Sequence, residues 1–176
     1  LWKKTLTYSD YWTYSLLIIA TSYFIIDLYI TLRYSQFDLL ILIHHIVCLL
    51  SILFSLSTGY GHFFIVFLLL SEATTPFMNI RWYLEQLNKK DSMFYIVNGV
   101  LMTFLWIIFR VLLFIVFFTV LYTHHDHFER ITNPLLRDLV ILFLYGGPMM
   151  LMVFNTYWLT KILRGVYKLY KNKIAS

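Results

Sequence analysis

Charged residues are scarce in this sequence. Asp, Glu, Lys and Arg make up 13% of its 176 residues, whereas 60% are hydrophobic and 20% are aromatic. A water-soluble globular protein needs more polar surface than this composition supplies. The scarcity of charge therefore excludes a soluble globular domain and makes lipid the main solvent of the folded chain.

Cysteine and linker sequence are also nearly absent. The single cysteine, Cys48, cannot form an intramolecular disulfide, and its apolar surroundings favour a small packing residue over a reactive thiol. Without a Ser/Gly/Pro-rich linker or an internal repeat, residues 1–176 are expected to form one domain. Because the chain opens on Leu1 without an initiator Met or a cleavable signal, we expect it to be N-terminally truncated, with one or more spans missing upstream.

Long apolar runs alternate with short segments that hold most of the charged residues. A hydrocarbon core about 30 Å thick needs about 20 helical residues. The connections are too short, and the alternation too weak, for a β-barrel. We therefore predict an all-α transmembrane bundle with five spans in this chain. They are expected at residues 11–32, 39–57, 63–80, 93–122 and 139–159.

Basic residues gather after the last span, at Lys161, Arg164, Lys168, Lys171 and Lys173. Lys and Arg resist translocation, which predicts a cytosolic C-terminal tail. The loops after the first and third spans also carry basic residues and fall on the same side. Contact with an anionic cytosolic leaflet explains the net charge of +5 without a nucleic-acid partner.

Three charged residues, Asp27, Glu72 and Arg110, lie well inside the apolar runs. A charge at mid-membrane costs at least a few kcal/mol, so each is expected to have a partner or a function. Under the predicted topology, every span places a polar group in the cytosolic half of the membrane. These groups are Asp27, the pair His44 and His45, Glu72 with Asn79, Asn98, and Asn155. We therefore expect a shared polar cavity that opens towards the cytosol or the inner leaflet.

Helical spacing supports this cavity on two spans. The second span carries a small and polar stripe at i, i+4, i+7 and i+11, formed by His44, Cys48, Ser51 and Ser55. The third span carries a matching stripe of Glu72, Thr75 or Pro76, and Asn79. Pro76 lacks an N–H and clashes with the carbonyl of Glu72, so the third span should kink beside a carboxylate.

The adjacent histidines project about 100° apart on a helix, so they cannot serve one small group in the same way. One of them can face a reacting centre while the other orients a carboxylate. A neutral imidazole can act as general base or nucleophile if Asp27 or Glu72 holds its other nitrogen. Alternatively, the Asp and His side chains simply satisfy one another and lock the helices together.

Three other features, an arginine, a Gly-Gly-Pro segment and a histidine-rich loop, give weaker indications of function. Arg110 can pair with Glu72 or a lipid phosphate, or extend to the outer interface. Gly146, Gly147 and Pro148 should break the last span for close packing or a kink. The loop residues His124, His125, Asp126 and His127 could bind a metal, but a short polar loop is more often solvated, and no metal is predicted.

An ordered set of segments carries a family resemblance. The segments are residues 23–28, His44-His45, residues 70–82, Asn98-Gly99, Arg110 and residues 155–158. Together they resemble the TLC domain family, which includes ceramide synthases, translocating-chain-associating membrane proteins and a neuronal ceroid lipofuscinosis protein. The series Ser71-Glu72, Pro76-Phe77, Asn79 and Arg81-Trp82 is most similar to the small TLC domain-containing proteins.

The resemblance implies a bundle of six or more helices around a lipid-facing cavity. Its expected lining residues are Ser51, Thr75, Asn79, Arg81, Asn98, Arg110 and Asn155. In ceramide synthases a His pair corresponding to His44 and His45 serves acyl transfer from acyl-coenzyme A to a sphingoid amine. The downstream His-Asp and Asp motif is incomplete here, because Ser71 replaces the His, Glu72 the first Asp and Thr75 the second.

Two functions follow from the residues and the resemblance together. The first is lipid homeostasis in the endoplasmic reticulum or another endomembrane, by binding, sensing or modulating membrane phospholipid or sphingolipid without a cofactor. The alternative is a membrane acyltransferase that uses acyl-coenzyme A as substrate. In that enzyme His44 or His45 is the base or nucleophile, and Asp27 or Glu72 orients it. The family also allows association with cargo or the translocon, but no residue pattern supports a protein partner.

Overall fold

The computed structural model describes residues 10–34 and 38–175, and within these ranges the chain forms helices and loops without a strand. Five helical segments of the described chain are long and apolar enough to cross a membrane. They are Tyr11–Arg33, Leu39–Thr58, His62–Gln86, Met93–Thr123 and Pro134–Tyr167. The predicted all-α membrane protein with five spans is therefore confirmed.

The helices of the third and fifth spans extend beyond the apolar runs that predicted them. The third continues past Ile80 to Gln86, supported by the Arg81–Glu85 ion pair at i, i+4. The fifth begins at Pro134 instead of residue 139, because the Asn133 side chain accepts from the Leu136 N–H and caps the helix. It also continues past residue 159. Polar residues at the ends of a span reach the membrane interface, so hydropathy alone sets these boundaries too short.

Local capping explains the limits of the second span, α2 (Leu39–Thr58). The Asp38 carboxylate accepts from the N–H of Leu40 at 2.9 Å and from the N–H of Ile41 at 3.4 Å. At the other end Gly59 adopts a φ of 77°, and its N–H donates to the Ser55 carbonyl. Glycine reaches this left-handed conformation without strain, which ends the helix sharply.

The described chain forms two compact units. The first unit comprises the residues up to Leu69 together with Val116–Leu151. It holds α1 (Tyr11–Tyr34), α2, α3 (His62–Leu69), η4 (His125–Arg130), α7 (Pro134–Ile141) and η5 (Leu142–Gly146), and it includes parts of α6 (Leu113–Thr123) and α8 (Gly147–Ala175).

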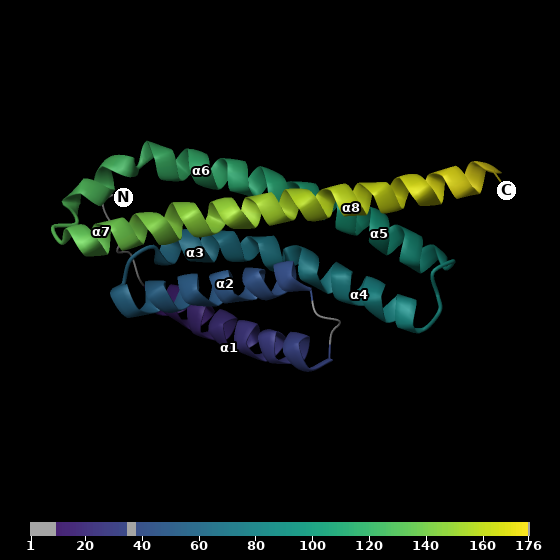
Figure 1. The fold of residues 1–176 in the computed structure, drawn as a ribbon, viewed down its shortest axis with the longest axis horizontal. Helices are drawn as coiled ribbons and strands as arrows, with labels where there is room; N and C mark the ends of the chain where they lie inside the picture. The colour runs from purple at the N-terminus through teal and green to yellow at the C-terminus, as the bar shows by residue number, and fades with distance from the viewer. Residues whose placement is uncertain (1–9, 35–37, 176) are drawn as a thin grey trace. The chain divides into compact units, whose positions relative to one another are not determined.

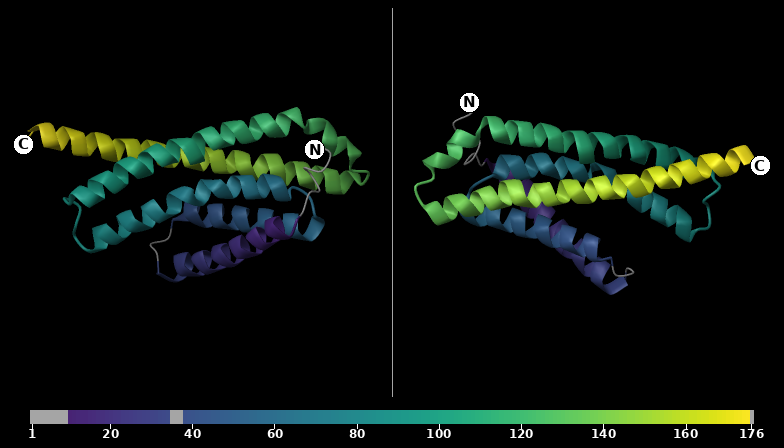
Figure 2. Two further views of the ribbon diagram at one scale, coloured as in Figure 1. Left: turned by 180° about the vertical axis from the view of Figure 1, so that it is seen from behind. Right: turned by 45° about the horizontal axis from the view of Figure 1, so that its top comes forward.

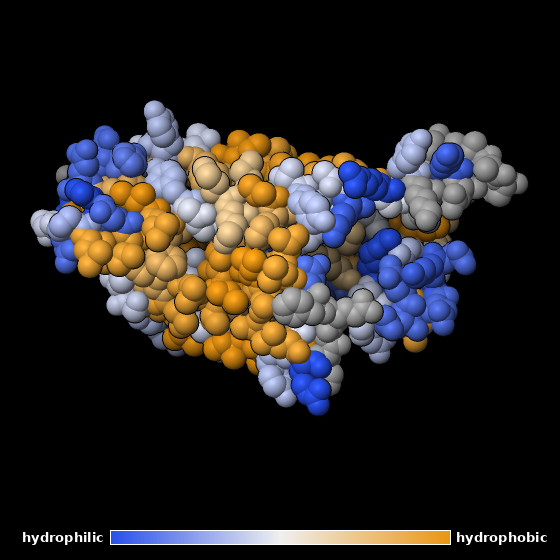
Figure 3. Space-filling view, in the orientation of Figure 1, coloured by the Kyte–Doolittle hydropathy of each residue, from blue (hydrophilic) through white to orange (hydrophobic). Residues whose placement is uncertain are grey.

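Helices α1, α2 and α3 pack against one another in the first unit (Figure 1). Their buried residues include Leu17, Phe24, Ile52 and Phe64, while many apolar residues on the outer faces stay exposed. The surface over α1 and α2 is accordingly mostly apolar in Figure 3. An exposed apolar surface of this extent is expected of helices that face lipid.

The second unit comprises Leu70–Ile115 and the chain from Met152 onward. It contains η2 (Leu70–Thr74), α4 (Thr75–Gln86), α5 (Met93–Ile107) and η3 (Ile108–Leu112). Helices α4 and α5 form an antiparallel hairpin, seen from behind in Figure 2. The third span is interrupted by the 3₁₀ turn η2, which ends two residues before Pro76 in the first turn of α4. The break expected at Pro76 is therefore present.

Candidate functional site

A histidine cluster, formed by Asp27, His44, His45 and Cys48, lies in the first unit. The Nε2 atom of His45 is 2.5 Å from Asp27 Oδ2, and the side chains are 9% and 37% exposed. The other ring nitrogen, Nδ1, donates to the Ile41 carbonyl at 2.8 Å. Both nitrogens of His45 are thus engaged, one by its own helix and one by α1.

These contacts constrain the protons of His45. A carbonyl oxygen only accepts, so Nδ1 carries a hydrogen. Nε2 then either carries a second hydrogen and faces a carboxylate, or accepts one from a protonated Asp27. In both forms the short contact holds the ring in one orientation and fastens α1 to α2.

His44 has different surroundings although it is the next residue. Its ring is nearly perpendicular to that of His45, at 86° with centroids 5.6 Å apart, and it is 7% exposed. Its Nε2 atom lies 3.7 Å from the Cys48 sulfur, one turn along α2. The two imidazoles therefore face different groups, as their helical spacing predicts.

An arginine cluster, formed by Arg110 and its partners, lies in the second unit. Its guanidinium donates from Nε to Thr74 Oγ1 at 2.7 Å, from Nη1 to Asn155 Oδ1 at 3.3 Å, and from Nη2 to Glu72 Oε1 at 3.2 Å. Nη2 also lies 3.3 Å from Thr75 Oγ1, which donates to Glu72 Oε2 at 2.5 Å. Arg110 is 3% exposed, so this is an ion pair with three added hydrogen bonds in an apolar setting.

Irregular helix geometry builds the arginine cluster. Arg110 lies in η3, a π-helical turn, and packs against the 3₁₀ turn η2 that carries Glu72 and Thr74. One turn before Arg110, the Trp106 ring lies 4.8 Å below the guanidinium, and its indole N–H donates to the Asn155 carbonyl at 3.1 Å. Such turns inside helices often mark functional sites, because they re-aim a side chain and free backbone groups.

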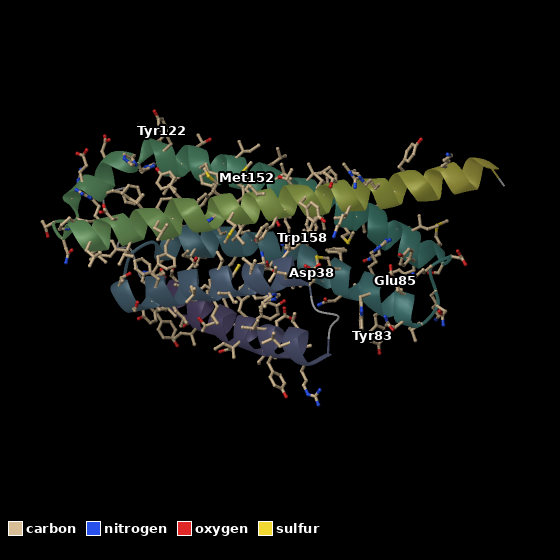
Figure 4. All side chains as sticks on the ribbon, in the orientation of Figure 1. Asp38, Tyr83, Glu85, Tyr122, Met152 and Trp158 are labelled. Carbon is tan, nitrogen blue, oxygen red and sulfur yellow. The ribbon has the colours of Figure 1, made fainter. Side chains whose placement is uncertain are left out.

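The α4–α5 hairpin holds a further polar contact group. The Arg81 guanidinium lies 4.2 Å from the Tyr95 ring centroid and 3.7 Å from Glu85. The Tyr95 hydroxyl donates to Glu85 at 2.5 Å. Figure 4 shows Glu85 and Tyr83 on different sides of α4. Nearby, the Asn98 amide donates to the Phe77 carbonyl at 2.9 Å, so Asn98 joins the two helices of the hairpin.

Gly99 leaves the space that Arg81 occupies. A Cβ atom at this position would lie 2.8 Å from Arg81 Nη1. We predict that Gly99→Leu displaces the guanidinium from Tyr95 and lowers the stability of the hairpin by about 1–2 kcal/mol. Thermal unfolding of the purified protein measures this change. Gly165→Leu is the matched control, because a Cβ there meets nothing within 4 Å. If both variants unfold at the wild-type temperature, the space at Gly99 has no role.

The structure brings the predicted site residues into separate groups. Asp27 meets His45 in the first unit, while Glu72, Thr75, Asn155 and Arg110 meet in the second. The meeting of the histidine pair with Glu72 in one cavity stays a prediction. Two other predicted residues, Ser51 and Asn79, line grooves.

Ser51 is 8% exposed and lines a groove between α2 and the fifth span within the first unit. Asn79 is exposed and lines an apolar groove of about 370 Å³ with Tyr83 and Phe94 in the second unit. Asn79 therefore lies apart from the stripe partner Glu72, whose carboxylate faces Arg110.

Sequence reasoning missed several partners of these clusters. The sequence pattern does not indicate Thr74, because a regular helix would turn its side chain away from Glu72 and Thr75. Trp106 precedes Arg110 by four residues, a spacing that predicts stacking on one face. The Ile41 carbonyl could not be foreseen, because a backbone acceptor has no sequence signal.

The loop histidines are held by local contacts. His124 Nδ1 donates to the Val120 carbonyl at 2.7 Å, and His125 Nδ1 shares a hydrogen bond of 3.3 Å with the Tyr145 hydroxyl. In the part of the chain that the structure describes, no group of three or more His, Cys, Asp and Glu side chains could hold a metal ion.

Comparison with known proteins places these clusters in a family context. A sequence model of the TLC domain matches residues 1–164, a range that extends across both units. The chain is 31% identical over 129 residues to protein CLN8 of Canis lupus familiaris, covering 73% of this chain and 43% of that protein. It is 31% identical over 155 residues to TLC domain-containing protein 4 of Homo sapiens, covering 85% of this chain and 57% of that protein.

A TLC domain-containing protein 4 A of Dictyostelium discoideum is 28% identical over 151 residues, covering 83% of this chain and 55% of that protein. The chain thus spans about half the length of the curated relatives that it matches. No solved structure matches it. The family match covers most of the sequence and includes the positions of both buried clusters, and on this basis the chain belongs to the TLC domain family.

Proposed function

We propose that this protein acts in lipid homeostasis, by holding the acyl part of a membrane lipid with its polar end at the histidine cluster. The observation that carries the proposal is the Asp27–His45 contact at 2.5 Å, inside two spans whose outer faces are apolar. Ionisable side chains inside a span are costly, which makes this position a candidate functional site. The molecules with ready access to them are those dissolved in the bilayer.

The lipid is proposed to be a phospholipid or a sphingolipid. The test is to purify the full-length protein in detergent and to identify the co-purifying lipids by mass spectrometry. We expect a defined lipid class at near-stoichiometric amount, and a loss of that class in His45→Ala. The matched control is His125→Ala, which changes a histidine of the η4 loop. A lipid profile equal to that of the surrounding membrane in wild type would contradict the proposal.

The second candidate function is acyl transfer from acyl-coenzyme A, and the contacts of His45 favour it. Because both nitrogens of His45 are engaged, the reacting imidazole is assigned to His44, and the Asp27–His45 pair is assigned to positioning. His44 would accept a proton from the acceptor amine or hydroxyl as that atom attacks the thioester carbonyl. The carbon–sulfur bond then breaks, and coenzyme A leaves as a thiol with that proton.

In this scheme Glu72 is assigned a structural role and not the positioning role. Its carboxylate faces Arg110 at 3.2 Å, so its charge is already matched within the second unit. The arginine cluster then keeps the third and fourth spans and the last helix in place. The assay supplies acyl-coenzyme A with sphingoid or lysophospholipid acceptors to the full-length protein, and product formation supports the enzyme.

The endoplasmic reticulum or another endomembrane is the proposed location, with the basic C-terminal tail in the cytosol. We predict that a C-terminal epitope tag is stained when only the plasma membrane is permeabilised. A glycosylation acceptor inserted after His124 is expected to be glycosylated, because the η4 loop would face the lumen. Glycosylation of an acceptor placed in the tail instead would reverse the proposed topology.

A further inference from the structure

The first unit contains a groove of about 300 Å³ between α2 and the fifth span. Val47, Leu50 and Ser51 line it from α2, and Phe143, Gly147 and Met150 line it from η5 and α8. Apart from the Ser51 hydroxyl these side chains are apolar. A site of this size lies at the lower end of the range of ligand pockets.

The groove results from helix geometry and glycine. Residues Leu142–Gly146 form a π-helical turn, which adds a residue to the turn and shifts the helix surface that meets α2. Gly147 follows directly, and a Cβ there would lie 3.4 Å from Ser51 Oγ and 3.5 Å from Val47 Cγ1. These distances are ordinary contact, so a methyl group fits whereas a larger side chain would fill the groove.

The surroundings of the groove favour hydrocarbon as its occupant. Leu50 and Leu142, which line it, are 50% and 59% exposed on spans that are long and apolar enough to cross a membrane. A polar molecule would lose its hydrogen bonds in this setting, at a cost of several kcal/mol. An acyl chain loses none.

Two of the α2 residues that line the groove lie on the face of this helix that carries His44. Val47 and Ser51 follow His44 at i+3 and i+7, so all three residues share one face. Seven residues of helix span about 10 Å. We propose that the groove holds the tail of the bound acyl chain and that the polar end of the lipid lies at His44. This inference rests on the proposed lipid function and adds the binding position of the acyl chain.

The experiment uses full-length protein and a fatty acyl probe with a photoreactive group near its methyl end. In wild type we expect crosslinks to the peptides that contain Phe143 and Met150. Gly147→Leu should lower labelling about tenfold, equivalent to about 1.4 kcal/mol of binding free energy. Gly147→Ala should keep the wild-type level, as should Gly165→Leu, which adds the same side chain where space is open.

The outcomes separate this inference from the function on which it rests. Wild-type protein that neither crosslinks nor co-purifies with lipid overturns the lipid function itself. Lipid binding with crosslinks elsewhere, or with labelling unchanged in Gly147→Leu, overturns the groove alone. If thermal unfolding shows that Gly147→Leu does not fold, the wild-type crosslinks test the groove alone. Crosslinks to the peptides with Phe143 and Met150 support it, and crosslinks elsewhere overturn it.

Discussion

Replacing Arg110 with leucine is expected to lower the free energy of unfolding by about 3–5 kcal/mol. The substitution removes the cation that faces Glu72 and the donor to Thr74 and Asn155, all inside apolar spans. A carboxylate that loses its buried partner pays a desolvation cost with no compensating attraction. Unfolding of the purified protein, followed by circular dichroism on heating in mild detergent, measures the change.

Arg137→Leu is the matched control for this prediction. Arg137 also pairs with a carboxylate, Asp138 at 3.5 Å, but the two side chains are 40% and 69% exposed. Solvent screening reduces such a pair to about 1 kcal/mol or less. Equal unfolding temperatures for the two variants would show that the arginine cluster does not stabilise the fold.

A double variant separates the ion pair from the hydrogen bonds. In Glu72→Gln with Arg110→Met, both charges are gone while the volumes are roughly kept. We expect the double variant to be more stable than Arg110→Leu, because no lone carboxylate remains. The same or lower stability would assign the effect of Arg110 to its bonds with Thr74 and Asn155 instead.

The second large effect is expected at the histidine cluster. If the protein transfers acyl groups, His44→Ala should lower kcat by about 10²–10⁴-fold, the usual contribution of a general base. Asp27→Asn should also lower kcat, since it removes the carboxylate that orients His45, with KM for the acyl donor little changed. Initial rates with acyl-coenzyme A and the acceptor measure both parameters.

Two controls test whether these effects are chemical. Added imidazole should restore part of the turnover of His44→Ala but none of that of Asp27→Asn, because only the first variant lacks the reacting ring. His62→Ala changes another buried histidine of the first unit, whose Nδ1 donates to the Gly59 carbonyl at 3.2 Å, and should leave kcat unchanged once folding is matched. A fall in kcat with His62→Ala, or full activity of His44→Ala, would remove His44 from the reaction.

Absence of turnover in the wild type would leave lipid binding as the function. The histidine cluster would then bind the polar end of the lipid instead of catalysing a reaction. In that case Asp27→Asn should reduce the amount of co-purified lipid, and there is no kcat to compare. Two measurements on one set of variants therefore separate an acyltransferase from a lipid-holding protein.

The break in the third span shows how far local chemistry predicts structure. Pro76 removes an N–H and crowds the carbonyl of Glu72, so an interruption at this point follows from the sequence. Its form does not follow, because a 3₁₀ turn and a plain kink both relieve the clash. Packing of η2 against η3 selects the 3₁₀ turn. The same holds for Gly146 and Gly147, which predict a break but not a π-helical turn.

Partner choice among the buried charges was open in the sequence. The sequence makes Asp27 and Glu72 equal candidates for the partner of a histidine. It also allows Arg110 to pair with Glu72, to pair with a lipid phosphate, or to extend to the outer interface. Each charge lies on a different span, and the pairing depends on which spans are neighbours and how each is rotated. The contacts of Asp27 with His45 and of Glu72 with Arg110 settle these pairings.

The sequence by itself determined the solvent of the fold, the number of spans in this chain and the residues that must be buried at a cost. These properties depend on the hydropathy, length and charge of continuous segments, which can be read directly along the chain. The tertiary structure decided which buried polar groups contact one another and where the groove between α2 and the fifth span lies. It also decided which histidine is hydrogen-bonded at both ring nitrogens. Those depend on distances between residues far apart in the chain, and on turns whose form is set by packing and not by any single residue.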